Sequence, residues 1–161
     1  GHPDEVDALL RATVGDGVLT YMRLQVVHNP RPVAVAAGEV RTLRTGAGTA
    51  VLAIGPMLGR VLEATADLDV SVLYTSTAAP IDARSLRAAA GDATRLVTVE
   101  PFHEGTLAAQ VVAALADRPA RFAFIGVPRR LVREYGSPQE HDRALGLDAA
   151  GLGARIRSAL S

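Results

Sequence analysis

From Thr49 onward, short apolar runs alternate with segments in which apolar residues recur every three or four positions. The first pattern is typical of buried β-strands and the second of amphipathic helices. Strands that are apolar on both faces indicate a mainly parallel sheet, because crossover helices cover both faces of such a sheet. The predicted strands are 49–54, 70–76, 95–100 and 121–127, and the predicted helices between them are 56–67, 82–90 and 105–117.

The first 30 residues predict one helix and one strand. Pro3 suits the first turn of a helix, and the apolar spacing continues over residues 3–14 until two glycines end it. Residues 18–24 are rich in β-branched and aromatic side chains and predict a strand. Because such a pair cannot bury both of its faces alone, it either packs on the following domain or ends a preceding one. We favour the second interpretation for residues 1–30, with Gly1-His2 as the remnant of an expression tag.

Residues 31–48 are rich in Pro, Gly and Ala and are typical of an inter-domain linker, with a short strand predicted at 40–44. The end of the chain is predicted to be helical in three pieces. The first is Leu131–Tyr135, and the second begins at Ser137-Pro138, where serine can cap the helix and proline takes its first position. The third is Asp148–Leu160, behind an aspartate cap.

Composition excludes several classes of function. The 17 acidic residues balance 17 basic ones, so charge does not indicate nucleic acid or a membrane surface as a partner, and no apolar run is long enough to predict a membrane span. Cysteine is absent, which excludes thiolate catalysis and cysteine-ligated metals and favours a cytoplasmic location. Lysine is also absent, so the chain has no candidate for an internal Schiff base.

Two glycine-containing segments resemble ligand loops only superficially. Gly46-Ala47-Gly48 precedes a predicted strand, whereas the glycines of a dinucleotide fingerprint follow a strand and open a helix. Gly55 and Gly59 do lie between a strand and a helix, but the lysine and hydroxyl residues of a phosphate loop are missing. We therefore predict tight turns at both places.

Three polar clusters are candidates for chemistry, and each has a structural alternative that we favour. His103 lies beside Glu100 and Glu104 after a strand end, where α/β sheets bind ligands. We favour a capping and surface cluster, because Glu104 near the start of helix 105–117 complements the helix dipole. His141-Asp142 is predicted to lie on a solvated helix face. Arg129, Arg130 and Arg133 could hold a phosphate, although a solvated or interfacial role is the simpler interpretation. No nucleophile motif is present, so we predict no catalytic residue and no metal ligand in this chain.

A set of motifs in fixed order resembles the C-terminal domain of the transketolase family, whose members use thiamine diphosphate. The resemblance covers residues 43–161. It rests on Gly55 at the end of a buried strand, Pro80-Ile81-Asp82, Val99-Glu100, Gly105, Gly126-Val127-Pro128, Tyr135-Gly136-Ser137 and Gly146-Leu147-Asp148.

The resemblance implies a fold and a division into domains. Residues 49–161 are expected to form a three-layer α/β/α sandwich on a mixed, mostly parallel sheet of about five strands, one of them antiparallel. Residues 3–29 resemble the last helix and strand of the preceding domain, which in the family binds the aminopyrimidine ring of the cofactor. The family's C-terminal domain carries no catalytic residue, so this chain is expected to support assembly and dimerisation and to be inactive alone.

The resemblance also implies cofactors and partners. Thiamine diphosphate and magnesium are expected in the complete enzyme, a homodimer that transfers a two-carbon ketol unit, but not on this chain. The expected partner is the remainder of that enzyme, whether this chain is a fragment or one subunit of a split enzyme. Three alternatives stay open: 1-deoxyxylulose-5-phosphate synthase, the beta subunit of a 2-oxo acid dehydrogenase, and a stand-alone binding or regulatory module.

One residue is a candidate for contact with substrate. In relatives that act on sugar phosphates, the predicted edge strand carries two arginines, the second of which contacts the substrate phosphate. Here Arg23 keeps the first position, while Val26 stands at the second. A valine cannot pair with phosphate, so the resemblance implies Arg23 as the substrate-binding candidate and an acceptor that is unphosphorylated or otherwise unusual.

Overall fold

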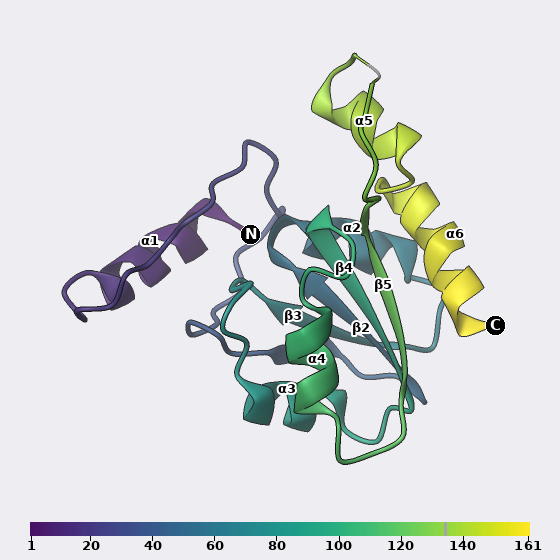
Figure 1. Ribbon diagram of the computed structural model, residues 1–161, viewed down its shortest axis with the longest axis horizontal. Coiled ribbons are helices and arrows are strands. Elements are labelled where there is room, and N and C mark those ends of the chain that lie inside the picture. Colours follow the sequence, from purple (N-terminus) through teal and green to yellow (C-terminus); the bar gives the residue numbers. More distant parts are fainter. Residues whose placement is uncertain (134) are drawn as a thin grey trace.

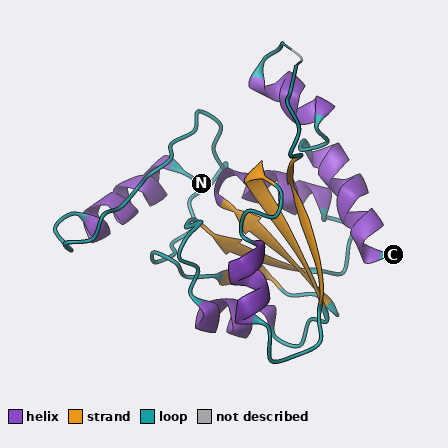
Figure 2. Cartoon of the chain, in the orientation of Figure 1, coloured by secondary structure: helices purple, strands orange, loops and turns teal. Residues whose placement is uncertain are grey.

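The computed structural model describes residues 1–133 and 135–161. Its strands and helices alternate as the hydrophobic pattern predicts from Thr49 onward (Figures 1 and 2). The strands are β1 (Arg41–Arg44), β2 (Thr49–Ile54), β3 (Ser71–Thr75), β4 (Arg95–His103) and β5 (Arg121–Val127). The helices are α1 (Pro3–Thr13), α2 (Leu58–Ala64), α3 (Ala83–Ala90), α4 (Ala108–Ala114), α5 (Pro138–Ala144) and α6 (Ala149–Leu160), with a short 3₁₀ turn η1 (Gly55–Met57) before α2.

The five strands form one mixed sheet in the order β1-β3-β2-β4-β5. Strands β2 to β5 are parallel to their neighbours, and only the edge strand β1 runs antiparallel, against β3. All six residues of β2 are buried, as expected for the central strand of a sheet covered on both faces. The predicted α/β architecture, with one antiparallel strand, is therefore confirmed.

Two hydrophobic clusters lie on opposite faces of the sheet and define the three layers (Figure 1). On one face, the side chains of α2 and α6 pack on alternate residues of the central strands, with Leu152 and Ile156 of α6 fully buried. On the other face, α3 and α4 cover the remaining residues, with Leu86 and Val111 fully buried. The alternation of side chains along each strand thus sends successive residues into different layers.

Strand β4 continues three residues beyond the predicted range of 95–100. Its register against β5 shifts between Val99 and His103, so the strand bends before the chain turns into α4. The bend brings β4 close to Gly126, where an added Cβ would lie 2.6 Å from the carbonyl oxygen of Phe102. The glycine of the Gly126-Val127-Pro128 motif therefore serves this close approach of two strands.

Two predicted elements are absent from the structure. Residues 18–24 form no strand, because no strand of the described chain lies beside them to complete a ladder. The predicted helix Leu131–Tyr135 is wrong for its described residues, 131–133 and 135, which follow Pro128 without helical geometry; position 134 lies outside the described residues. The helix predicted over 105–117 is shorter, since Gly105 has a positive φ of 73° and residues 104–107 form turns.

Candidate interface at the carboxyl edge of the sheet

A groove of ≈ 970 Å³ lies between the carboxyl edge of the sheet and the first 28 residues, which we call the arm. On the sheet side it is lined by the ends of β2, β3 and β4, including Gly55, Ser76 and Phe102. On the other side it is lined by α1 and the segment that follows it. The carboxyl edge of a parallel sheet is where open α/β folds bind their ligands, so this groove is the candidate functional site.

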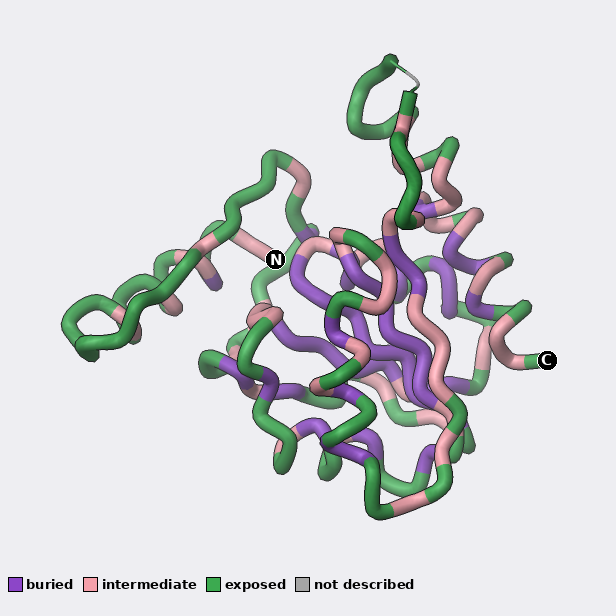
Figure 3. Tube along the Cα trace, viewed as in Figure 1, coloured by how far each residue is buried: buried purple, intermediate pink, exposed green. Residues whose placement is uncertain are grey.

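The segment after α1 exposes apolar side chains to an unusual extent. Figure 3 shows most of the arm as exposed. Five large apolar side chains of this segment are between 67% and 99% exposed: Val18, Leu19, Tyr21, Leu24 and Val26. Soluble proteins rarely gather so many exposed apolar side chains in one segment without a partner surface. The arm therefore has the character of an interface.

The arm is fastened to the sheet by a buried carboxylate. Glu5 of α1 is only 5% exposed, and its Oε2 atom accepts a 2.5 Å hydrogen bond from the hydroxyl of Tyr74 on β3. The same oxygen lies 2.9 Å from the nitrogen of Gly1, and Oε1 accepts a 2.8 Å hydrogen bond from the backbone N–H of Val33. Burial, together with the bond to Glu5, raises the pKa of Tyr74 well above its ordinary value.

Asn29 makes a second attachment at the end of the arm. This residue is 1% exposed, and its side-chain amide donates to the carbonyl of Gly55 at 3.0 Å. Its Oδ1 atom accepts from the N–H of Gly59 at 3.1 Å, and its backbone N–H donates to the carbonyl of Gly1 at 2.8 Å. Asn29 thus joins both ends of the arm to the turn between β2 and α2, which explains the tight turn predicted at Gly55 and Gly59.

Arg23 lies in this groove, but as an exposed side chain on an irregular segment. Val26 is 97% exposed three residues further on. A contact between Arg23 and substrate would therefore require the larger assembly.

The cluster around His103 separates into structural roles. The buried carboxylate of Glu100 accepts hydrogen bonds from the backbone N–H groups of Thr106 and Leu107, ahead of α4. Burial is the main influence on Glu100 and raises its pKa, although these N–H groups oppose the shift. Glu104 turns away to pair with Arg155 of α6 at 2.8 Å. A carboxylate does satisfy N–H groups ahead of the helix, as the favoured interpretation expects, but it is the buried Glu100 and not a surface residue that does so.

The prediction for His141-Asp142 was wrong in part. Asp142 does not lie on a solvated face, because its carboxylate is 24% exposed and pairs with Arg60 of α2 at 2.5 Å. The charge was visible in the sequence, but its partner lies 82 residues away and no spacing rule links them. Arg129, Arg130 and Arg133 are all exposed, after the end of β5.

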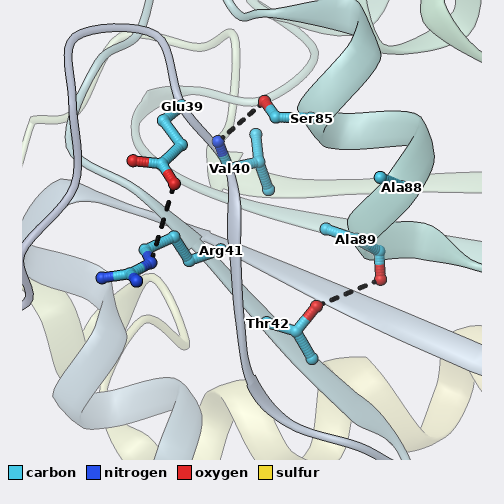
Figure 4. Close-up of a pocket in the computed structure, with 7 residues that line it drawn as sticks. All are labelled: Glu39, Val40, Arg41, Thr42, Ser85, Ala88 and Ala89. Atoms are coloured by element: carbon cyan, nitrogen blue, oxygen red, sulfur yellow. Dashed lines mark hydrogen bonds and ion pairs between the residues drawn. The ribbon is translucent and has the colours of Figure 1, made fainter.

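A shallow hollow of ≈ 340 Å³ also forms where β1 crosses α3 (Figure 4). The backbone N–H of Val40 donates to the hydroxyl of Ser85 at 3.0 Å, and the hydroxyl of Thr42 donates to the carbonyl of Ala89 at 3.3 Å. These bonds fasten the edge strand to the helix, so we assign this hollow a structural role. Across the described residues, no three or more acidic, histidine or cysteine side chains gather as metal ligands would. No helix in the same part of the chain is long and apolar enough to span a membrane.

Comparison with known proteins decides the family. The family model described as transketolase, C-terminal domain, matches residues 38–152. The chain belongs to the transketolase family. Its fold agrees with a solved structure described as a split gene transketolase, inactive beta4 tetramer, with a TM-score of 0.65 at 24% identity over 80% of this chain and 44% of that one.

Two curated relatives of this transketolase-family chain extend the comparison. One is an uncharacterized 33.6 kDa protein in the fasciation locus of Rhodococcoides fascians, 43% identical over 99% of this chain and 52% of its own length. The other is 1-deoxy-D-xylulose-5-phosphate synthase 2 of Geobacter sulfurreducens, 35% identical over 79% of this chain and 21% of its own length. The chain spans about half of the first relative and about a fifth of the second.

Glu5, Asn29 and Tyr74 were all missed in the sequence. Glu5 has the appearance of an ordinary acidic residue in the first turn of a helix. Tyr74 offered a usable signal, because a tyrosine within an otherwise aliphatic buried strand needs a partner for its hydroxyl. Asn29 precedes Pro30, a pair typical of turns, so the sequence carries no signal for its buried bonds.

Proposed function

We propose that this chain is the C-terminal, non-catalytic part of a transketolase-like enzyme that transfers a two-carbon ketol unit in the cytoplasm. The observation that carries the proposal is the combination of the family match with the exposed apolar segment of the arm beside the groove. Residues 18–24 expose apolar side chains of the kind that a strand buried in another sheet requires. On this view these residues complete the sheet of the preceding domain, and the chain supports assembly and dimerisation without reacting itself.

We assign the cofactors to the remainder of the enzyme. Thiamine diphosphate with magnesium requires oxygen ligands for the metal and donors for the diphosphate. The described residues offer no cluster of metal ligands, and Glu100 and Glu104 are engaged by backbone N–H groups and by Arg155. These residues do not fit the cofactor, so no chemical step is assigned to this chain. Arg23 is its one proposed contact with substrate.

A second candidate is the same domain of a 1-deoxyxylulose-5-phosphate synthase, favoured by the 35% identity to the Geobacter enzyme. Both candidates make the same prediction for the isolated chain, which is no activity. They differ in the product of the complete enzyme: a ketol unit moved between sugars in one case and 1-deoxyxylulose 5-phosphate in the other.

The deciding experiment begins with the size of the native polypeptide that carries this C-terminus, measured by blotting and mass spectrometry. A band several times larger than 16.8 kDa, or a band of that size that co-purifies with a second subunit, is expected. The purified species is then assayed for both products with and without thiamine diphosphate. A lone 16.8 kDa species, with no partner and no cofactor-dependent activity, would overturn the proposal in favour of a stand-alone module.

A further inference from the structure

The attachment of α1 to the sheet is polar, whereas most packing in this chain is apolar. Glu5 is the only buried residue of α1. The large apolar side chains Leu10 and Val14, at the far end of the helix, are 48% and 71% exposed. The hydrophobic effect has no direction and allows surfaces to slide, while hydrogen bonds fix distance and angle. The position of α1 therefore rests on directional bonds.

A buried carboxylate is stable only when its oxygens are satisfied. Glu5 meets this condition with donors from two separate places, which are the Tyr74 hydroxyl on β3 and the Val33 backbone after the arm. An apolar contact of the same size would bury α1 without the cost of desolvating a charge. In some proteins, polar groups buried in such places select one geometry over others.

We propose that the Glu5–Tyr74 hydrogen bond is an orientational lock that sets the angle between the arm and the sheet. Tyr74 lies in the rigid centre of the fold, fully buried and paired in the ladder with β1 and β2. Glu5 lies on the element that, under the proposed function, belongs to the preceding domain. The lock then fixes that domain on the C-terminal domain, and this part of the inference rests on the proposed function. The proposal that this bond orients the arm within the chain is independent of the proposed function.

The lock can be tested on the chain of residues 1–161. Because the sequence contains no cysteine, two introduced cysteines take spin labels at unique positions. Suitable sites are Leu19→Cys on the arm, where the side chain is 99% exposed, and Ala88→Cys on the exposed face of α3. Pulsed electron spin resonance then gives the distribution of distances between arm and domain. We expect a narrow distribution in this background and a clearly broader one when Tyr74→Phe is added.

Hydrogen exchange supplies a second, label-free measurement. Tyr74→Phe removes one hydroxyl that donates to a charged group, so we expect the amides of α1 to exchange at least about tenfold faster. The amides of β2 and β4 should exchange at the unchanged rate, which shows that the sheet remains folded. Glu5→Gln keeps an acceptor oxygen and should give a smaller effect. Tyr135→Phe is the matched control, since Tyr135 is fully exposed.

The outcomes separate the possibilities. Equal distance distributions and equal α1 exchange in the parent and in Tyr74→Phe would overturn the lock. A double variant Glu5→Gln/Tyr74→Phe that is no looser than the worse single variant would support a direct coupling between the two side chains. Because neither measurement uses substrate or cofactor, failure of the proposed function would leave these results standing.

Discussion

Arg60 of α2 and Asp142 of α5 form an ion pair that holds the last part of the chain on the domain. The Nη2 atom of Arg60 donates to Asp142 Oδ2 at 2.5 Å, and its Nη1 atom donates to the carbonyl of Leu147 at 3.1 Å. Both side chains are about three-quarters covered, at 23% and 24% exposed. Helix α5 has no buried residue of its own. Its position therefore depends on this pair together with Leu147, which follows the helix and is buried in the core.

A double-mutant cycle measures this dependence. Arg60→Ala and Asp142→Ala should each destabilise the fold, with a coupling free energy of about 1 kcal/mol. Charged hydrogen bonds that are partly covered from solvent contribute more to stability than fully exposed ones. The measurement is the free energy of unfolding in urea for both single variants and the double variant. The exposed pair Arg11–Asp7 within α1 is the matched control and should show a smaller coupling. Fully additive effects at Arg60 and Asp142 would contradict the prediction.

The α6 layer should depend strongly on Leu152. This side chain is 0% exposed and packs in the cluster that α2 and α6 share with the sheet. Leu152→Ala should reduce the free energy of unfolding by roughly 3 kcal/mol. The substitution loses the free energy gained by burying the leucine side chain away from water, and it leaves a cavity. Leu62→Ala makes the same change at a position 36% exposed and should have a distinctly smaller effect. Similar losses in the two variants would show that the packing of α6 is not as described.

Stability should depend on pH through the cap of α3. The carboxylate of Asp82 accepts hydrogen bonds from the N–H groups of Arg84 and Ser85, and these lower its pKa below the ordinary 3.8. A lowered pKa means that the cap stabilises the folded state above pH 3.8 and loses this effect as pH falls through the lower value. Asp82→Ala should therefore melt at a lower temperature than the parent at pH 7, and the difference should shrink in acid.

Thermal melts from pH 2 to pH 7 check this dependence. Asp92→Ala, in the exposed turn after α3, serves as the control and should follow the parent closely. A difference between Asp82→Ala and the parent that stays constant across this range would mean that Asp82 does not cap the helix through its charge.

Two substitutions in the arm test substrate contact in the complete enzyme, one by removing an arginine and one by adding one. If Arg23 contacts substrate, Arg23→Ala should raise KM for the acceptor without changing thermal stability, since its side chain is exposed. Val26→Arg should improve turnover of phosphorylated sugars, because a guanidinium pairs with phosphate and valine does not. Arg31→Ala, another exposed arginine outside the groove, is the control for net charge. An unchanged KM in Arg23→Ala would contradict the contact between Arg23 and substrate. No gain from Val26→Arg would contradict the loss of a phosphate contact at this position.

The central elements of the fold were predictable because their signals are local. The ranges of β2 and β5 agree with prediction, since each is a mainly apolar run; β2 is buried throughout, and β5 is partly buried at the edge of the sheet. Caps were equally clear: Ser137 and Asp148 accept hydrogen bonds from the first turns of α5 and α6, as the sequence suggests. In each case the side chain and its partner lie within a few residues.

The remaining features depend on partners that are distant in sequence. Residues 18–24 have the composition of a strand, but a strand exists only with a neighbour to bond, and the described chain supplies none there. The bonds of Glu5 to Tyr74 and of Asp142 to Arg60 span 69 and 82 residues. Composition and periodicity carry no information on such pairs, so the contacts that hold the arm and α5 could not be found from them.

The exposed apolar segment of the arm also has a consequence for how a cell handles this chain. Chaperones and proteases act on molecules that display apolar surface normally covered in the native assembly. A copy whose arm remains bare would be removed, while a copy whose arm is covered would persist. The five side chains from Val18 to Val26 would thus tie the abundance of this chain to the supply of whatever covers them, a form of quality control that requires no dedicated regulator.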